Sequence, residues 1–385
     1  MTGTRAVPEI IDRANQFDQP LSQKALNRAL LARQLLLTRQ AMPALDAIEH
    51  LVGMQAQAPM PPYFGLWTRL EDFQPGDMAD LITNRHAVRI ALMRSTVHLV
   101  SARDCLMLRP LLHPVIACGV TSRNPYGRHL EGLDLDEVVA AGRSALEARP
   151  QTLSDLGKQL QTRWPERDAD ALGAALRSLA PLVQLPPRGI WGAGGQAICT
   201  TAEAWLDRPL DTDPSIEEMV LRYLAAFGPA TVKDVQAWSG LTKLRAVVDR
   251  LRPRLVTFRN EAGQELFDLP DAPRPAPDTP APVRFLPEWD NILLSHADRT
   301  RIIADNDRQR TWTVNGIVPG SILLDGFVAG TWKITRERSA ATLRISPFQP
   351  LSDEHRAALH AEGEQLLTFA APDTGVRAIE IASPV

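Results

Sequence analysis

Two glutamines separated by one residue are the first positions whose chemistry suggests a reaction site. Gln55 and Gln57 flank Ala56 in a segment that follows a short expected helix. Side chains two residues apart in an extended segment point the same way, so both amides can face one group. A glutamine carbonyl accepts a hydrogen bond from water and faces developing positive charge, but it is no general base at neutral pH. The plainer alternative is a polar loop after a helix.

Acidic side chains are scarce in the sequence around these glutamines. The nearest are Glu49 and Glu71. An enzyme that cleaves a neutral glycosidic bond uses a pair of carboxylates, one of which protonates the leaving group. The glutamine pair therefore favours a leaving group that already carries positive charge and can depart without a proton.

Three more polar residues belong to an expected strand pair, Val88–Met93 and Thr96–Val100. Thr96 and His98 share one face of the second strand, and Arg94 lies in the turn between the strands. Arg94 is expected to contact a phosphate or to brace the glutamine segment. His98 has apolar neighbours, which favours a buried structural histidine, and the alternative is a polar group beside the glutamines.

Basic residues gather in one stretch although the whole chain carries a formal net charge of −3. Only 5 of the 42 basic residues are lysines, and arginine is the side chain whose planar fork suits phosphate. The stretch contains six candidate DNA contacts and one acid, Asp249. These candidates are Lys243, Arg245, Arg250, Arg252, Arg254 and Arg259. The alternative for each is a solvated helix face.

The elements that must position these residues repeat along the chain. Three helices followed by a strand pair recur, and in two copies the second helix opens with Thr-x-x-Asp, at Thr152 and Thr231. The four-residue turn Gly240–Lys243 joins the second and third helices of the last copy, which is typical of a winged helix-turn-helix. Six prolines between Pro270 and Pro282 mark a stiff linker.

These patterns predict an α+β fold that is mainly helical, with three tandem winged-helix units and a β-rich C-terminal module. The expected boundaries are an N-terminal extension 1–23, units at 24–125, 126–210 and 211–269, the linker 270–282 and the β-rich domain 283–385.

Several classes of protein are excluded by what the sequence lacks. No stretch approaches the 18 apolar residues of a membrane span, and no secretion signal is visible. Three widely spaced cysteines indicate neither a disulfide framework nor a zinc site, and the scattered histidines argue against a metal site. The glycine-rich stretch 189–195 has no GK[ST], which argues against a nucleotide cofactor. We expect a reducing cytoplasm and no cofactor.

Four motifs in order carry a resemblance to a known family. They are Gly53–Gln57, Arg94–Asp104, Leu286–Asp290 and Asp325–Trp332. Together they closely resemble the bacterial winged-helix DNA glycosylases of the AlkZ/YcaQ type over roughly residues 24–385. The resemblance implies three winged helices arranged as a C-shaped channel around duplex DNA, and removal of N-alkylated purines. Some members of that family unhook interstrand crosslinks.

The family's catalytic motif corresponds to Gln55-Ala56-Gln57 in this chain. Glutamine at both polar positions resembles the azinomycin-resistance branch more than the YcaQ branch, whose second polar residue is commonly aspartate. Ala56 is smaller than the branched spacer typical of the family. The resemblance gives no role for Asp290.

The expected protein is therefore a monofunctional DNA glycosylase that acts on cationic N-alkylated purines in double-stranded DNA. Its few lysines, with none at 53–60, argue against lyase chemistry. We expect a monomer in the cytoplasm that associates with the nucleoid. The alternatives are a winged-helix regulator or architectural protein without catalysis, and a protein-interaction scaffold.

Overall fold

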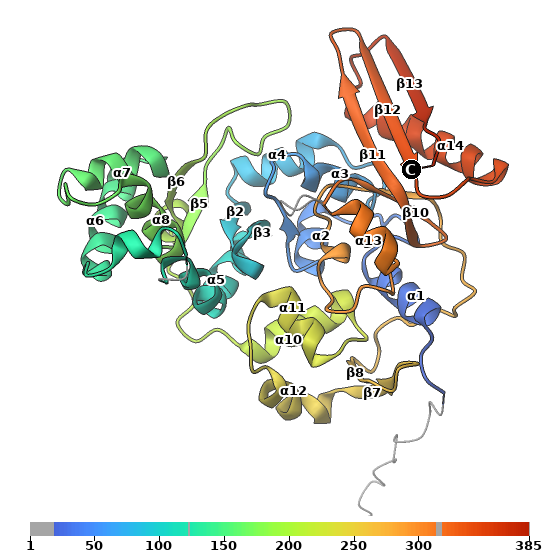
Figure 1. The fold of residues 1–385 in the computed structure, drawn as a ribbon, viewed down its shortest axis with the longest axis horizontal. Helices are drawn as coiled ribbons and strands as arrows, with labels where there is room; N and C mark the ends of the chain where they lie inside the picture. The colour runs from blue at the N-terminus through green and yellow to red at the C-terminus, as the bar shows by residue number, and fades with distance from the viewer. Residues whose placement is uncertain (1–18, 122–123, 313–317, 385) are drawn as a thin grey trace, which may run out of the picture.

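The computed structural model describes residues 19–121, 124–312 and 318–384, and it confirms the α+β, mainly helical class (Figure 1). Most of the expected N-terminal extension lies outside these residues. The helices are α1 Gln23–Arg33, α2 Ala44–His50, α3 Pro61–Trp67, α4 Pro75–Thr83, α5 Ala102–Ala117, α6 Leu135–Ala148, α7 Leu153–Gln161, α8 Ala169–Leu179, α9 Ala202–Leu206, α10 Ile216–Phe227, α11 Val232–Ser239, α12 Arg245–Leu251, α13 Asp305–Thr311 and α14 Asp353–Ala370.

Three sheets hold the strands. A six-stranded sheet has the order β1-β3-β2-β5-β6-β4, with β1 Met54–Gln55, β2 Ala87–Ala91, β3 Val97–Ser101, β4 Gln151–Thr152, β5 Leu182–Gln184 and β6 Ile198–Thr201. A hairpin pairs β7 Val256–Arg259 with β8 Glu265–Asp268. A five-stranded sheet has the order β13-β12-β11-β10-β9, with β9 Arg284–Leu286, β10 Ser321–Leu324, β11 Phe327–Arg336, β12 Ala340–Pro347 and β13 Val376–Ile381.

Helix starts follow the side-chain chemistry of the sequence. The Thr152 hydroxyl accepts a hydrogen bond from the amide of Asp155 at 3.1 Å and caps α7. Thr231 and Asp234 form a reciprocal capping box that begins α11, and Gly240 ends that helix in the left-handed conformation. Both Thr-x-x-Asp motifs therefore begin helices, as expected.

The six-stranded sheet crosses the boundary expected between residues 125 and 126. Strand β2 pairs with β3 on one side and with β5 on the other, so the two expected wings form one surface. Helices α6, α7 and α8 pack together at one end of the molecule, and the five-stranded sheet with α14 forms the other end (Figure 1).

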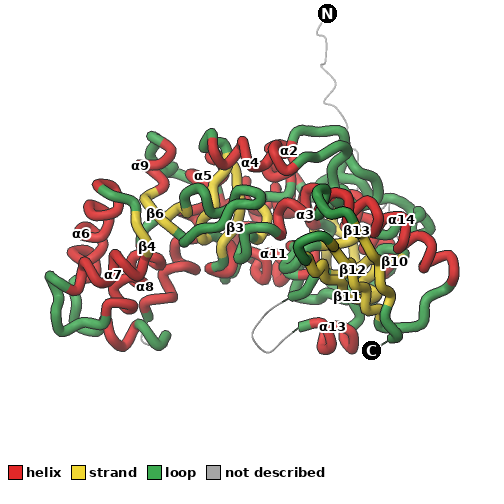
Figure 2. The backbone as a smooth tube through the Cα atoms, turned by 90° about the horizontal axis from the view of Figure 1, so that it is seen from above, coloured by secondary structure: helices red, strands yellow, loops and turns green. Residues whose placement is uncertain are grey.

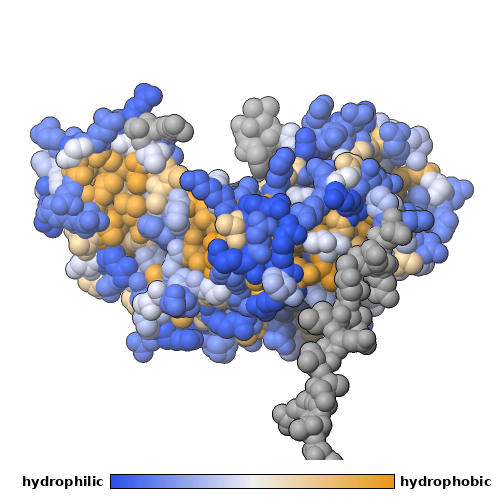
Figure 3. Space-filling view, turned by 90° about the horizontal axis from the view of Figure 1, so that it is seen from below, coloured by the Kyte–Doolittle hydropathy of each residue, from blue (hydrophilic) through white to orange (hydrophobic). Residues whose placement is uncertain are grey.

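Both ends project to the same side of the molecule, with β3 and α11 between them (Figure 2). The space-filling view shows the surface hollowed between the two ends (Figure 3). Two large apolar cores meet behind this region. Val52 belongs to the core that includes α5 and α10, and Met54 and Ala56 belong to the core shared by α2–α4 and the C-terminal sheet. The glutamine segment thus lies at the junction of both cores.

Candidate active site

The glutamine segment is held at the edge of the six-stranded sheet. Gly53, with φ 88°, leads into β1, and a Cβ there would lie 2.5 Å from Val100 Cγ1, so only glycine fits. Strand β1 pairs with β3 so that Gln55 lies opposite His98, and the Ala56 amide donates to the Val97 carbonyl at 2.7 Å. Ala56 is fully buried, which explains why a small spacer is accommodated here.

The two glutamines differ in exposure. Gln55 is 6% exposed, and Gln57 is exposed. No hydrogen bond of the Gln57 side chain occurs within the described part of the chain. Gln57 is therefore the amide open to an incoming molecule, and Gln55 is the amide whose position the protein sets.

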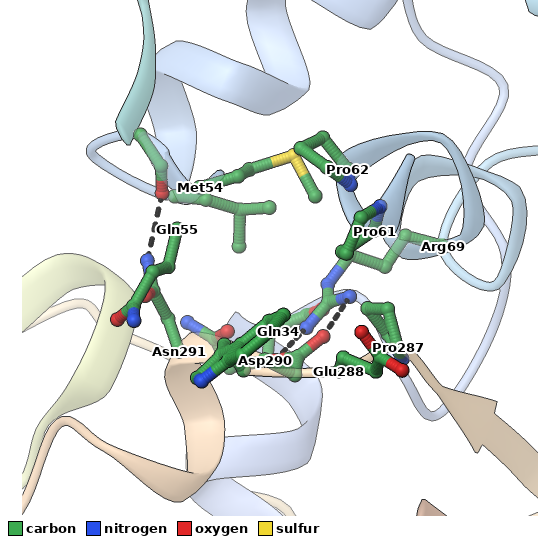
Figure 4. Close-up of a pocket in the computed structure, with 13 residues that line it drawn as sticks. Gln34, Met54, Gln55, Pro61, Pro62, Arg69, Pro287, Glu288, Asp290 and Asn291 are labelled. Carbon is green, nitrogen blue, oxygen red and sulfur yellow. Dashed lines mark hydrogen bonds and ion pairs between the residues drawn. The ribbon is translucent and has the colours of Figure 1, made fainter. Parts of the chain in front are cut away.

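Gln55 lines a small pocket together with residues from distant parts of the chain (Figure 4). Gln34, Glu288, Asp290 and Asn291 are also in its wall. The pocket encloses about 10 Å³ of space open to water, which is room for roughly one water molecule. It is therefore a site that can order a water beside the Gln55 amide.

Two carboxylates lie in the wall of this pocket, although the sequence around the glutamines had led us to expect few acids there. Glu49 and Glu71 are nearest in sequence, but Glu288 and Asp290 are the acids in the pocket. Asp290 is committed to Arg69: both carboxylate oxygens accept from its guanidinium at 2.8 Å, and both side chains are nearly inaccessible. Desolvation in the pocket raises the pKa of the Glu288 carboxyl, and Lys333 partly offsets that shift.

The segment after β9 also supports the glutamine segment from below. Asn291 donates through Nδ2 to the Gly53 carbonyl at 2.9 Å (Figure 4), and Asp290 accepts from the Ile292 amide at 3.1 Å. Asp290, whose role the sequence left open, is thus a support for the pocket floor. The sequence contains one indirect signal for the ion pair with Arg69, which is that Asp290 belongs to the family motif Leu286–Asp290.

Arg94 joins Gln55 to α11. Its Nη2 donates to Gln55 Oε1 at 2.7 Å and its Nη1 donates to the Trp238 carbonyl at 2.7 Å. The turn η1 Met93–Ser95 holds Arg94 at φ 56°, a left-handed conformation that is strained for arginine. Burial and the nearby Arg299 lower the pKa of Arg94 to about 10, so the side chain remains a cation at neutral pH.

The side chains of His98 and Thr96 form hydrogen bonds with backbone carbonyls. The Thr96 hydroxyl donates to the Met93 carbonyl at 3.0 Å, and His98 Nδ1 lies 2.9 Å from the Thr96 carbonyl. A carbonyl only accepts, so Nδ1 carries the proton and Nε2 the lone pair. Burial and Arg94 lower the pKa of His98 to about 3, and the ring is neutral at physiological pH. His98 supports the strand opposite Gln55 without access to solvent.

The six basic residues predicted to contact DNA lie on the turn before α12, on α12, on η4 Arg252–Arg254 and on β7. Arg250 Nε donates to Glu217 Oε1 at 2.9 Å, and Arg245 and Arg252 both pair with Asp249 and Glu265. Arg259 donates to the Gly263 carbonyl at 2.9 Å. Much of this positive charge is therefore neutralised by neighbouring carboxylates.

In residues 19–121, 124–312 and 318–384, no three His, Cys, Asp or Glu side chains are grouped so that they could hold a metal ion. Within the same ranges, no helix is long and apolar enough to cross a bilayer.

Comparison with known proteins identifies the chain as a DNA glycosylase. It belongs to the AlkZ-like DNA glycosylase family, whose sequence model matches residues 48–369. The structure is similar to that of Streptomyces sahachiroi DNA glycosylase AlkZ, with a TM-score of 0.80 and 19% identity, over 94% of this chain and 100% of that chain. No curated protein sequence matches the chain. Family membership confirms an enzyme that acts on DNA.

Proposed function

We propose that this enzyme hydrolyses the N-glycosidic bond of cationic N-alkylated purines in duplex DNA, with Gln55 and Gln57 as its catalytic residues. The observation that carries the proposal is the Gln55 amide, fixed by Arg94 at the edge of a pocket with room for one water. Within the described residues no carboxylate is hydrogen-bonded to either glutamine, and Asp290, one of the two acids in the pocket wall, is committed to Arg69. The chemistry therefore suits a substrate that needs no proton.

The reaction follows from the charge of the lesion. An alkylated purine is already positive, so the C1′–N bond breaks with its electron pair moving to the base, which leaves neutral. An amide carbonyl has two lone pairs, so Gln55 Oε1 can accept from water while it accepts from Arg94. Gln57, which is exposed, faces the positive charge that develops on the sugar. Water then bonds to C1′ and releases its proton to solvent.

The fold around the glutamines supports three further features of the proposed function: the winged-helix units, the position of the DNA and hydrolysis without lyase chemistry. Helices α10, α11 and α12 with the β7–β8 hairpin have the order of a winged helix, and we assign the earlier helices and the shared sheet to two more such units. We place the duplex DNA in the hollow between the two ends of the molecule (Figure 3). Among the described residues no lysine lines the pocket beside Gln55, which favours hydrolysis without lyase chemistry.

A lesion panel tests this function. Duplexes containing N7-methylguanine, an N7–N7 interstrand crosslink, hypoxanthine or uracil are incubated with excess enzyme, and base release is measured. We expect release of N7-methylguanine and unhooking of the crosslink, with little release of the two neutral bases. Tight duplex binding with no release of any base would instead favour a non-catalytic DNA-binding protein.

A further inference from the structure

A second concave surface lies between α7, α8 and the six-stranded sheet. It has a volume of about 690 Å³, and we call it the α7–α8 cleft. Four basic residues line it, Arg109, Lys158, Arg177 and Arg188, against one acid, Asp155. This excess of positive charge was not visible in the sequence, because residues 126–280 as a whole contain more acids than bases.

Three of these cations are not neutralised by any carboxylate of the described residues. Lys158 and Arg177 are exposed and form no hydrogen bond or ion pair there. Arg188 is half-buried, and within the described residues it donates only to the Gly195 carbonyl, at 3.0 Å. Arg109 differs, because it is buried and donates to the Ser178 and Ala180 carbonyls, so it supports the wall.

The floor of the cleft contains polar atoms that lack a partner. Gln184 Oε1 and Arg188 Nε are buried, and neither finds a hydrogen-bond partner in the described parts of the chain. Asp155, the one acid, already accepts from the Thr152 hydroxyl at 2.7 Å. Buried groups of this kind normally have partners, so a ligand with acceptor oxygens and bound water fits the cleft.

The cleft reaches β3, the strand that pairs with the glutamine segment. Ala91 and Val97 line it, and the Val97 carbonyl accepts the hydrogen bond of the Ala56 amide. Helices α7 and α8 lie on the side of the molecule where the hollow opens (Figure 2). A duplex bound in the hollow therefore lies near both the glutamines and the cleft.

We propose that the α7–α8 cleft binds the phosphodiester backbone of DNA beside the lesion, through Lys158, Arg177 and Arg188. This inference rests on the proposed function, because it assumes that the lesion lies at the glutamine segment. Arg177 lies on α8, the last helix of the second expected unit, so the main contact lies in that unit and not on α12 of the third unit, where the sequence had placed it. The α12 cations are paired with acids, and the cleft cations are free to pair with phosphates.

The salt dependence of duplex binding tests this site. Each phosphate contact contributes ~0.9 to the slope of log K against log salt. We expect Arg177→Ala and Lys158→Ala each to lower the slope by about that amount, and the double variant by about twice it. Both side chains are exposed, so the substitutions leave folding nearly unchanged. The probe is a lesion-free duplex, titrated at several salt concentrations by fluorescence anisotropy.

Arg208→Ala is the matched control. Arg208 is exposed and follows α9, which lies on the face opposite the hollow (Figure 2), and its removal changes the net charge equally. Unchanged slopes in the cleft variants, or an equal drop in Arg208→Ala, would overturn the proposal. Failure of the proposed function gives a different result. The wild type would then release no base, while the cleft variants would still show lower slopes of log K against log salt.

Discussion

Two regions that the sequence marked as functional prove to differ in how their charges are used. Around the glutamines, Arg69 and Asp290 form an ion pair whose side chains are 2% and 3% exposed. On the basic surface formed by α12, η4 and β7, which we call the α12–β7 surface, Arg250 is 58% exposed and its partner Glu217, on α10, is 33% exposed. The first pair holds a pocket in shape, and the second mainly cancels charge. A cluster of basic residues in a sequence therefore indicates a binding surface only where neighbouring carboxylates do not neutralise it.

The largest expected effect is on the buried pair. Asp290→Asn leaves Arg69 as a buried cation without its carboxylate, which typically lowers the free energy of unfolding by about 3–5 kcal/mol. Urea denaturation followed by circular dichroism measures the loss. A variant as stable as the wild type would show that the pair does not support the pocket.

Arg94→Ala tests the link between the pocket and α11. A hydrogen bond to a charged group contributes about 1.5–3 kcal/mol, so we expect base release to slow by roughly 10- to 100-fold as Gln55 loses its anchor. Single-turnover release from an N7-methylguanine duplex is the measurement. Arg94→Lys keeps the charge but not the two-pronged geometry, and we expect partial activity from it. Full activity in Arg94→Ala would contradict the positioning role.

The pH dependence of stability tests the buried histidine. The pKa of His98 is lowered in the folded state to about 3, so below pH 6.5 the unfolded chain binds a proton that the folded chain cannot. The free energy of unfolding should therefore fall on acidification from pH 6.5, by at most about 1.4 kcal/mol per pH unit from this residue. Urea titrations at pH 7.5, 6.5 and 5.5 measure this. His98→Gln should flatten the slope, and an equal slope would rule out a buried neutral ring.

The smallest effect is expected on the α12–β7 surface. Glu217→Gln removes the partner of Arg250, and an exposed pair contributes about 0–1 kcal/mol, less at high salt. The freed arginine should leave stability nearly unchanged and strengthen duplex binding slightly at low salt. A loss of stability comparable to that of Asp290→Asn would erase the distinction between the two regions.

The sequence predicts local features of this protein better than distant contacts. The strand pair that contains His98 and the Thr231 capping box follow from apolar alternation and from side chains three residues apart. The partnership of Arg69 with Asp290 joins residues far apart in the chain, and no local pattern specifies it. The same holds for Glu217 opposite Arg250. Sheet formation across residues 125 and 126 likewise depends on strand pairing that short-range patterns do not encode.

The predicted site residues show the same difference between positions set by local structure and positions set by distant contacts. Gln55, Arg94 and His98 come together because β1 pairs with β3, and Arg94 lies in the turn that leads from β2 into β3. The pocket needs Glu288, Asp290 and Asn291 as well, and only packing of the segment after β9 brings these there. The free cations of the α7–α8 cleft were not distinguishable by sequence from other surface charges.

The most direct test of the central claim is single-turnover release of N7-methylguanine from duplex DNA by the wild type and by Gln55→Ala/Gln57→Ala. Removal of a group that stabilises transition-state charge typically costs 10²–10³-fold in rate, so we predict a loss of at least about 10²-fold. Duplex affinity and the unfolding midpoint, measured on the same preparations, should stay near those of the wild type. Equal rates of release by the two proteins would contradict the assignment of catalysis to the glutamine pair.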